Sequence, residues 1–412
     1  MKSIFRKFIP FWMFLVLYKI GGALHYSLIS PLGAKILPLW IVGILMGGGS
    51  IIQLLCDVPA GHLLDRFGYL KLLKITTFIF LFAGIALIFN FSLVTFIISL
   101  TAATFGWVFF GPGVNAYILS QAPKDHAGKF ISLRDIFGSI GVFLSSALLG
   151  FILALSPTSM GWIILIMMLI ALGTLFFSPQ DTISAHAEQK LSTQHHHIRR
   201  NYIHQLLPAL KKLNPASSML LLTGLTSSIF YGVIWFVVPL VIIESANSGI
   251  LSIGLGIFDL AVVVFGFLLG KVADKSNKRA LVFFGLLLFS LSGMFLGFNF
   301  NLLFLLFGFL ATTGDEMASL SLWSWLHDLD KEHAHDGLVS GIINLFQDLG
   351  WAIGPMVAGF LFTLIGPSWT IMSAALLLFV TWIIYQFLIR HHRPLGSIFD
   401  VPQKPHRARH RI

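Results

Sequence analysis

Long apolar stretches separated by short polar ones run through the whole chain. Asp, Glu, Lys and Arg are missing from four runs, which are residues 75–123, 136–180, 280–314 and 349–389. Each run is long enough for two membrane-spanning helices of about 20 residues with a short turn between them. Two further stretches, 8–61 and 217–270, carry only isolated charges. The pattern therefore predicts six helical hairpins, which amount to twelve transmembrane helices.

A polar segment, residues 178–215, divides the expected helices into two sets. It is rich in Lys, Arg and His, and it is too polar to lie in lipid. We therefore expect it to link an N-terminal six-helix bundle (1–177) to a C-terminal one (216–390), with a short surface helix near residues 202–213. A basic tail, residues 391–412, follows the second bundle.

The ends of the helices can be placed from polar and small residues. Turns inside four of the hairpins are expected at residues 90–92, 156–160, 298–301 and 366–368. Lys2, Arg6 and Lys7 precede the first apolar stretch, as in a signal peptide. No convincing small-residue cleavage site follows them, so we expect a first helix that is retained.

Composition supports a membrane protein. Hydrophobic residues make up 56% of the 412 residues and charged residues 11%, whereas soluble domains carry about 25% charged residues. The mean hydropathy is +0.87. The single cysteine, Cys56, excludes a disulfide framework and any site built from several cysteines.

The net charge is +10, and the basic residues lie almost entirely on one side of the expected helices. Of 27 Lys and Arg residues, 24 fall in the two termini, the linker and the loops on the same side, and the opposite loops hold only Lys35. Cytoplasmic loops carry such an excess. We therefore expect a multi-pass protein of the inner or plasma membrane with both termini cytoplasmic. The charge is an orientation signal, so no nucleic-acid partner is expected. The histidines of the linker and tail are interpreted as solvated polar residues, and binding of a soft divalent metal by them is the alternative.

The two halves repeat one another at an offset of 209 residues. The segment after the second helix and the one after the eighth share a motif, Gly61, Asp65 and Arg66 in the first and Gly270, Asp274 and Lys275 in the second. The same offset joins further pairs, which are Gly128 and Gly337, Phe137 and Phe346, Gly141 and Gly350, and Gly150 and Gly359. Such repeats are typical of secondary transporters.

With Gly68, the first motif reads GxxxDRxG, and together with the six-plus-six helices it resembles the major facilitator superfamily over essentially the whole chain. The resemblance implies an all-α integral membrane fold of twelve helices in two six-helix bundles. It also implies that the motif loops lock the cytoplasmic side. Asp65 is then expected to face residues 337–341, and Asp274 to approach Arg134 at the start of the fifth helix.

A pattern associated with antiporters of this family is incomplete. Helix 5 lacks the proline and two glycines of GxxxGPxxGG between Gly141 and Gly150, and the fourth helix has no Arg. Drug/proton antiport is weakened but stays open.

Ionisable residues inside spans are costly and are functional candidates by default. Those expected within spans are Lys19, Asp57, Arg134, Asp135, Asp259, Asp315, Glu316 and Asp348. For Asp57, Arg134 and Asp135, which lie near helix ends, an ion-pair or gating role is favoured over substrate contact. Lys19, Asp259, Asp315 and Asp348 are expected near mid-membrane.

The family resemblance places helices 1, 4, 7 and 10 around the cavity. It thereby favours Lys19, Asp315 or Glu316, Asn115, and the pair Tyr231 and Trp235 as cavity residues. Ordinary packing is an alternative for the two aromatic residues. Lys19 is predicted to pair between the bundles with Asp315 or Glu316, of which Asp315 is favoured as the residue that faces the cavity, and the pair is predicted to couple transport to protons. A static bridge that only stabilises the fold is the alternative.

The resulting interpretation is a secondary transporter of a small solute that rocks two bundles around a midplane site, with an ion gradient, the proton first, as the energy source. No Walker A pattern occurs. Neither cofactor nor metal is expected, and neither is catalysis. The expected partners are the solute, membrane lipid and protons, and the chain is expected to be a monomer. A non-transporting sensor or assembly protein on the same scaffold is the alternative.

Overall fold

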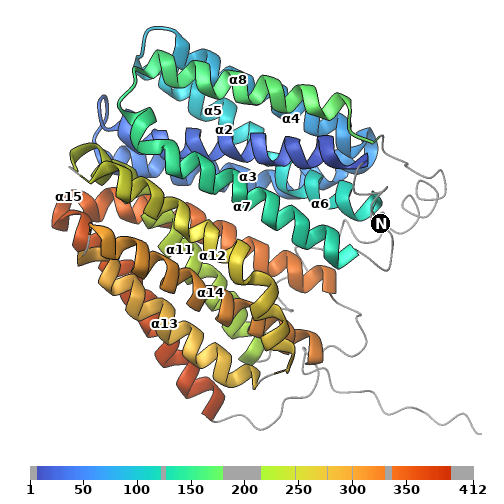
Figure 1. Ribbon diagram of the computed structural model, residues 1–412, viewed down its shortest axis with the longest axis vertical. Coiled ribbons are helices and arrows are strands. Elements are labelled where there is room, and N and C mark those ends of the chain that lie inside the picture. The colour runs from blue at the N-terminus through green and yellow to red at the C-terminus, as the bar shows by residue number, and fades with distance from the viewer. Residues whose placement is uncertain are drawn as a thin grey trace, which may run out of the picture.

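A computed structural model of the chain describes residues 7–121, 127–179, 215–245, 247–275, 277–298, 300–329 and 336–390, and their regular structure is helical. Residues 180–214 of the expected linker and the whole expected tail lie outside these residues, as does the surface helix predicted at 202–213. The chain forms two helical bundles, which Figure 1 shows in blue to green and in yellow to red.

The first bundle contains seven helical segments, α2 (Ile9–Gly33), α3 (Leu39–Phe67), α4 (Tyr69–Ile88), α5 (Leu93–Val108), α6 (Phe110–Gln121), α7 (Ala127–Leu153) and α8 (Pro157–Phe176). The second contains α11 (Pro215–Glu244), α12 (Ser248–Lys275), α13 (Lys278–Phe298), α14 (Leu302–Leu329) and α15 (Asp336–Arg390). α5 and α6 follow one another within a single apolar stretch, Leu93–Ile118.

Three of the predicted turns are confirmed, at 90–92, 298–301 and 366–368, whereas the turn expected at 156–160 lies at 154–156, just before α8 begins at Pro157. Ser92 caps α5 by accepting a hydrogen bond from the Thr95 backbone, and Ser156 caps α8 in the same way. α13 ends at Phe298 and α14 begins at Leu302. Inside α15, Gly366 has φ of 78°, a left-handed conformation that breaks the helix and that glycine adopts without a steric penalty.

Ten helical stretches within the described residues are long and apolar enough to cross a membrane. One of them, Ile343–Leu388, has 46 residues and contains the break at Gly366. That length is more than twice the ~20 residues that one crossing needs. In α12 the apolar stretch Ser248–Val264 is shorter. The fold is therefore that of an all-α, multi-span membrane protein.

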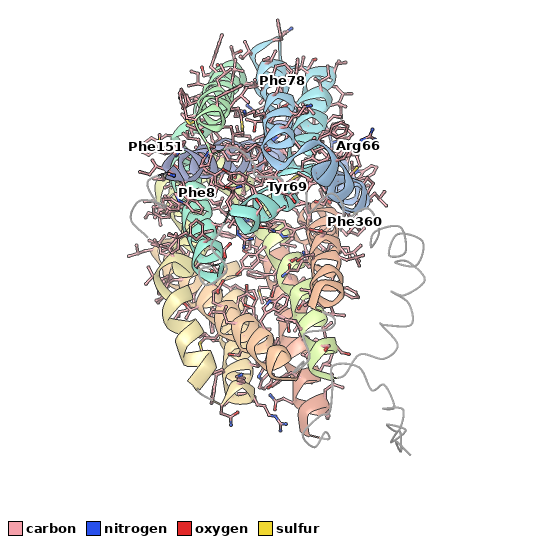
Figure 2. The ribbon with its side chains drawn as sticks, turned by 90° about the vertical axis from the view of Figure 1, so that its right-hand side faces the viewer. Phe8, Arg66, Tyr69, Phe78, Phe151 and Phe360 are labelled. Atoms are coloured by element: carbon pink, nitrogen blue, oxygen red, sulfur yellow. The ribbon has the colours of Figure 1, made fainter. Side chains whose placement is uncertain are left out.

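The outer surface of the bundles is apolar. Phe78, Phe151 and Phe360 are among the large hydrophobic side chains that project outwards (Figure 2), and they are 53%, 73% and 58% exposed. An apolar surface of this extent would aggregate in water. It fits a bundle that is surrounded by lipid.

The repeat read from the sequence is also a repeat of contacts. A Cβ at Gly141 of α7 would lie 2.6 Å from the Val16 carbonyl oxygen of α2, and a Cβ at Gly350 of α15 would lie 2.5 Å from the Leu225 carbonyl oxygen of α11. All these residues correspond at the offset of 209. Each half thus packs its first helix on its fifth apolar segment at the same glycine, because only glycine permits this approach.

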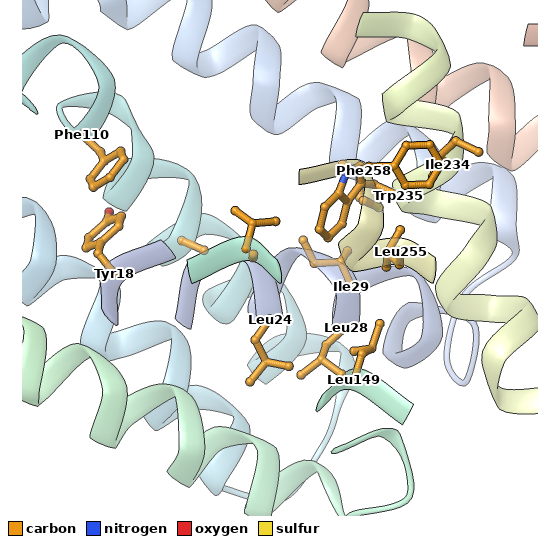
Figure 3. Close-up of a cluster of buried hydrophobic side chains, with 14 of the residues drawn as sticks. Tyr18, Leu24, Leu28, Ile29, Phe110, Leu149, Ile234, Trp235, Leu255 and Phe258 are labelled. Carbon is orange, nitrogen blue, oxygen red and sulfur yellow. The ribbon is translucent and has the colours of Figure 1, made fainter. Parts of the chain in front are cut away.

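The two halves meet along two symmetric seams. Gly150 of α7 packs on the Ser248 carbonyl of α12, and Gly359 of α15 packs on the Leu39 carbonyl of α3. Both pairs again correspond at the offset of 209. One cluster of buried apolar side chains includes residues of both halves (Figure 3). From these seams the bundles diverge towards the end at which α2 begins, on the right of Figure 1.

The motif loop after α3 depends on Gly68. Its φ of 89° and ψ of 146° join α3 to α4, and this backbone region is open essentially to glycine alone. The exposed Arg66 guanidinium lies 5.2 Å from the centre of the Phe67 ring. The last glycine of the predicted motif is therefore required by backbone geometry.

Candidate functional site

Charged side chains of both halves gather between the bundles. The first half contributes Lys19 from α2 and the neighbours Arg134 and Asp135 from α7, and the second contributes Asp259 from α12 and Glu316 from α14. Lys19, Asp259 and Glu316 lie near the middles of their helices. We call these five residues the central charge cluster.

Lys19 extends between α7 and two aromatic rings. Its methylene chain passes Gly138 and Gly141 of α7. Its Nζ lies 5.0 Å from the centre of the Trp107 ring and 5.3 Å from that of Phe110. A cation over ring faces is attracted by their negative quadrupole. Within the described part of the chain, the ammonium makes no hydrogen bond and no ion pair.

The carboxylate that acts most strongly on Lys19 is Asp259, from the opposite half. Asp135 attracts the ammonium more weakly, and Arg134 repels it. The Ser139 hydroxyl of α7 lies next to the Asp259 carboxylate. Asp259 therefore links the two halves by charge, with Ser139 of the first half beside it.

The predicted pairing of Lys19 with Asp315 is not formed in this structure. Asp315 accepts hydrogen bonds from Ser227 Oγ at 2.8 Å and from Tyr231 Oη at 3.0 Å, both on α11 of its own half. Ser227 and Tyr231 are four residues apart and hence on one face of the helix. Together they hold the carboxylate away from Lys19.

Glu316, not Asp315, is directed towards the opposite half. Adjacent residues on a helix point about 100° apart, so anchoring Asp315 on α11 turns Glu316 to another side. The charges that act on Glu316 are Asp315, Asp135 and Asp259, in decreasing order. All three are acidic, and among the described residues Glu316 has no hydrogen-bond donor.

Arg134 forms an ion pair within its own helix. Its Nε and one terminal nitrogen donate to Asp135 Oδ1 at 2.8 and 2.6 Å. The other terminal nitrogen donates to Asn115 Oδ1 of α6. The structure thus brings three residues singled out from the sequence into one contact, which ties α6 to α7.

The predicted pair Tyr231 and Trp235 is divided between two tasks. Tyr231 anchors Asp315 and packs against Phe258 and Phe289. Trp235 is buried, and its ring lies 6.3 Å from that of Tyr26 in the other half. Tyr26 and Trp235 correspond at the offset of 209, so this contact lies where the two halves meet.

The contacts described for the central charge cluster do not include the other predicted residues. Asp348 lies half-buried on α15. The side chains of Asp57, Asp65, Asp274 and Lys275 and the glycines Gly61 and Gly270 are outside the residues whose environment is described, as are residues 337–341. The locking contacts expected for Asp65 and Asp274 therefore stay predictions.

Four residues of the site were missed at the level of sequence, and they are Trp107, Phe110, Ser139 and Ser227. The repeat could have revealed some of them, because Trp107 corresponds to Glu316 and Ser139 to Asp348 at the offset of 209. Over the described residues, no group of three His, Cys, Asp or Glu side chains is placed to hold a metal ion.

Comparison with known proteins decides the family. The family model of the Major Facilitator Superfamily matches residues 8–355 and 220–408. The chain belongs to the major facilitator superfamily. The resemblance inferred from the motif after the second helix is therefore confirmed.

Solved structures of transporters share the fold at low sequence identity. A POT family transporter in complex with 5-aminolevulinic acid has a TM-score of 0.65 and 13% identity, over 93% of this chain and 95% of that one. A D-xylose-proton symporter has a TM-score of 0.63 and 16% identity, over 90% of this chain and 96% of that one. A structure of the nucleoside transporter NupG has a TM-score of 0.66 and 13% identity, over 93% of this chain and 99% of that one. No curated protein sequence matches the chain significantly.

Proposed function

We propose that the protein is a secondary active transporter of a small solute that works by rocker-switch alternating access. The observation that carries the proposal is the central charge cluster, because intramembrane charges are expensive and persist where they serve a pathway. It lies between two bundles that are related by the 209-residue repeat. Counting α15 as two crossings, α12 as one, and α5 with α6 as one yields the expected twelve helices, six on each side of the linker.

The protein is proposed to lie in the inner or plasma membrane, with both termini and the linker on the cytoplasmic side. It rests on the 24 basic residues of the termini, linker and same-side loops against Lys35 alone on the other side. In that orientation the bundles diverge towards the cytoplasm and the glycine seams close the outside. The chain acts as a monomer with lipid around it.

Topology can be tested by labelling single cysteines. Ser192→Cys and Ser397→Cys, each in a Cys56→Ala background, are expected to react with a membrane-impermeant maleimide only after the cells are opened. Lys35→Cys is the matched control and is expected to react in intact cells. Labelling of either Ser192→Cys or Ser397→Cys from outside would contradict the orientation.

Proton coupling is proposed to act through Asp259 and Glu316. When the bundles rock, Lys19 moves relative to Asp259 because the two belong to different halves. A carboxylate left alone at this depth costs several kcal/mol, and taking up a proton removes that cost. Lys19 and Asp259 thus replace the pair that the sequence suggested. The D-xylose-proton symporter of the same fold is a precedent for such coupling.

Flux into proteoliposomes tests the function. Vesicles that contain the full chain and an internal pH indicator are given an inward proton gradient, and sugars, nucleosides, amino acids and dipeptides are added one class at a time. A transporter is expected to acidify the lumen and to accumulate one class. Protein-free vesicles are the control. Absence of flux for every class, with a correctly folded protein, would favour the sensor or assembly protein.

A further inference from the structure

The two halves of the molecule contribute different charged residues to the central charge cluster. Lys19 and the Arg134–Asp135 pair come from the first half, whereas Asp259 and Glu316 come from the second. At the offset of 209 the equivalents of Lys19 and Arg134 are Ser228 and Ile343, and those of Asp259 and Glu316 are Ser50 and Trp107. The repeat therefore does not require the charges. Each half places charged residues where the other has neutral ones.

Lys19 offers an unsatisfied cation. Its ammonium rests over Trp107 and Phe110 and has no acceptor among the described residues, while Asp259 attracts it from beyond ion-pair distance. A lysine ammonium has three donors, and leaving them unpaired inside a protein is costly. An anionic group placed beside the ammonium, away from the ring faces, would satisfy them.

Glu316 offers an unsatisfied anion. Asp315 is satisfied by Ser227 and Tyr231, and Asp135 by Arg134. Glu316 has no donor in the described structure, and the charges acting on it are all negative. A cationic group next to Glu316 would relieve that repulsion.

The two unsatisfied groups belong to one site. Asp259 and Asp135 each act on both Lys19 and Glu316, so the ammonium and the carboxylate share these two neighbours without acting on one another directly. They come from α2 and α14, on opposite sides of the gap that opens when the bundles rock. A ligand that contacts both would join the halves.

We infer that the transported solute is a zwitterion whose anionic group binds Lys19 and whose ammonium group binds Glu316. This inference rests on the proposed function and names its substrate class. A solute with a positive charge alone would leave Lys19 unpaired, and one with a negative charge alone would meet Asp259, Asp135 and Glu316. A neutral sugar would satisfy neither charge. The rings of Trp107 and Phe110 provide an apolar surface for the rest of the solute.

Matched probes test the inference on the purified full chain in detergent. The zwitterions are L-phenylalanine, L-alanyl-L-phenylalanine and 6-aminohexanoate, which differ in the separation of their charges. The single-charge analogues are phenethylamine and 3-phenylpropionate, and 3-phenylpropionamide is the neutral one. Binding is measured by calorimetry. One zwitterion is expected to bind at least about tenfold more tightly than every analogue, as one charged hydrogen bond provides.

Variants assign each charge to its residue. Lys19→Gln is expected to lower the affinity for that zwitterion about tenfold or more, to the level of phenethylamine, and Lys19→Arg to restore most of it. Glu316→Gln is expected to lower it to the level of 3-phenylpropionate, with Glu316→Asp as the conservative variant. Lys35→Gln and Glu244→Gln, at exposed positions outside the cluster, are the matched controls. Thermal unfolding of each variant shows that it has folded.

Three outcomes would overturn the inference. They are binding of a single-charge or neutral analogue as tightly as any zwitterion, no binding of any zwitterion, and unchanged affinity in both Lys19→Gln and Glu316→Gln. Failure of the proposed function looks different. In that case a zwitterion would bind, but no solute would cross the membrane of proteoliposomes.

Discussion

The two halves of the molecule join their equivalent helices at equivalent points but with different chemistry. In the first half, Tyr18 Oη of α2 donates to the Gly106 carbonyl of α5 at 2.5 Å. In the second, Ser227 Oγ of α11 donates to the Asp315 carboxylate of α14 at 2.8 Å. Tyr18 and Ser227, and likewise Gly106 and Asp315, correspond at the offset of 209.

The next residue along each helix carries the difference in charge. Lys19 lies over Trp107 in the first half, and their equivalents in the second are Ser228 and Glu316. The helix–helix contact is thus common to both halves, whereas the charge next to it is particular to each. The contact thus belongs to the fold, and under the proposed function the charges serve the solute and its coupling.

The largest expected effect contrasts Lys19 with its equivalent. Lys19→Ala is expected to reduce solute-driven proton flux about 100-fold, because loss of one partner from a buried charge contact costs ~2–5 kcal/mol. Ser228→Ala is expected to leave the flux within about twofold of that of the unmodified protein, a difference in free energy of less than ~0.5 kcal/mol. Initial rates in proteoliposomes measure both. Equal losses in the two variants would contradict the assignment of function to the charge.

Glycine contacts should behave alike in the two halves. Gly141→Ala and Gly350→Ala each place a Cβ at 2.6 or 2.5 Å from a backbone oxygen of the facing helix. Such overpacking costs about 1–3 kcal/mol, so both are expected to lower the melting temperature in detergent to a similar extent. Gly173→Ala is the control, because a Cβ there meets nothing within 4 Å. A large effect in one half only would show that the repeat is not structural.

The motif loops should respond unequally to an exchange of residues. Gly68 and Asn277 correspond, and each accepts a bond from the backbone of the following helix, at 3.2 Å from Leu72 and 3.1 Å from Leu281. Gly68→Asn is expected to cost about 1–3 kcal/mol, because its φ of 89° and ψ of 146° exclude side chains. Asn277→Gly is expected to cost only a few tenths of a kcal/mol, as for other N-caps. Thermal unfolding compares the two, and equal losses would contradict the backbone argument.

The smallest expected effects concern the paired hydrogen bonds. Tyr18→Phe removes the hydroxyl that donates to the Gly106 carbonyl oxygen. The loss is expected to lower the free energy of unfolding by about 1 kcal/mol. Ser227→Ala leaves Asp315 with Tyr231, so a smaller loss is expected, and a Ser227→Ala/Tyr231→Phe double variant is expected to lose more than the sum. Unfolding midpoints test this, and strict additivity would show that the two donors act independently.

Much of the fold can be derived from the sequence for a simple reason. Lipid requires ~20-residue apolar helices whose backbone bonds are satisfied internally, so runs without charge mark the spans and polar residues mark their ends. The turn capped by Ser92 and the break at Gly366 were predicted in this way. The offset of 209 residues also paired Gly141 with Gly350 and Gly150 with Gly359, and the structure places all four at close helix contacts.

For the candidate site, the sequence pattern and the tertiary packing each determined a different part. Local pattern alone identified Lys19, Asp259, Asp315 and Glu316 as costly charges, and by itself it determined their approximate depth. Only the tertiary structure decided which of them meet. Asp315 and Glu316 point ~100° apart, and the rotation of α14 against Ser227 and Tyr231 selects the one that faces the other half. A one-dimensional pattern specifies depth and face to within a helical turn, but contacts between helices depend on rotations that the whole bundle sets.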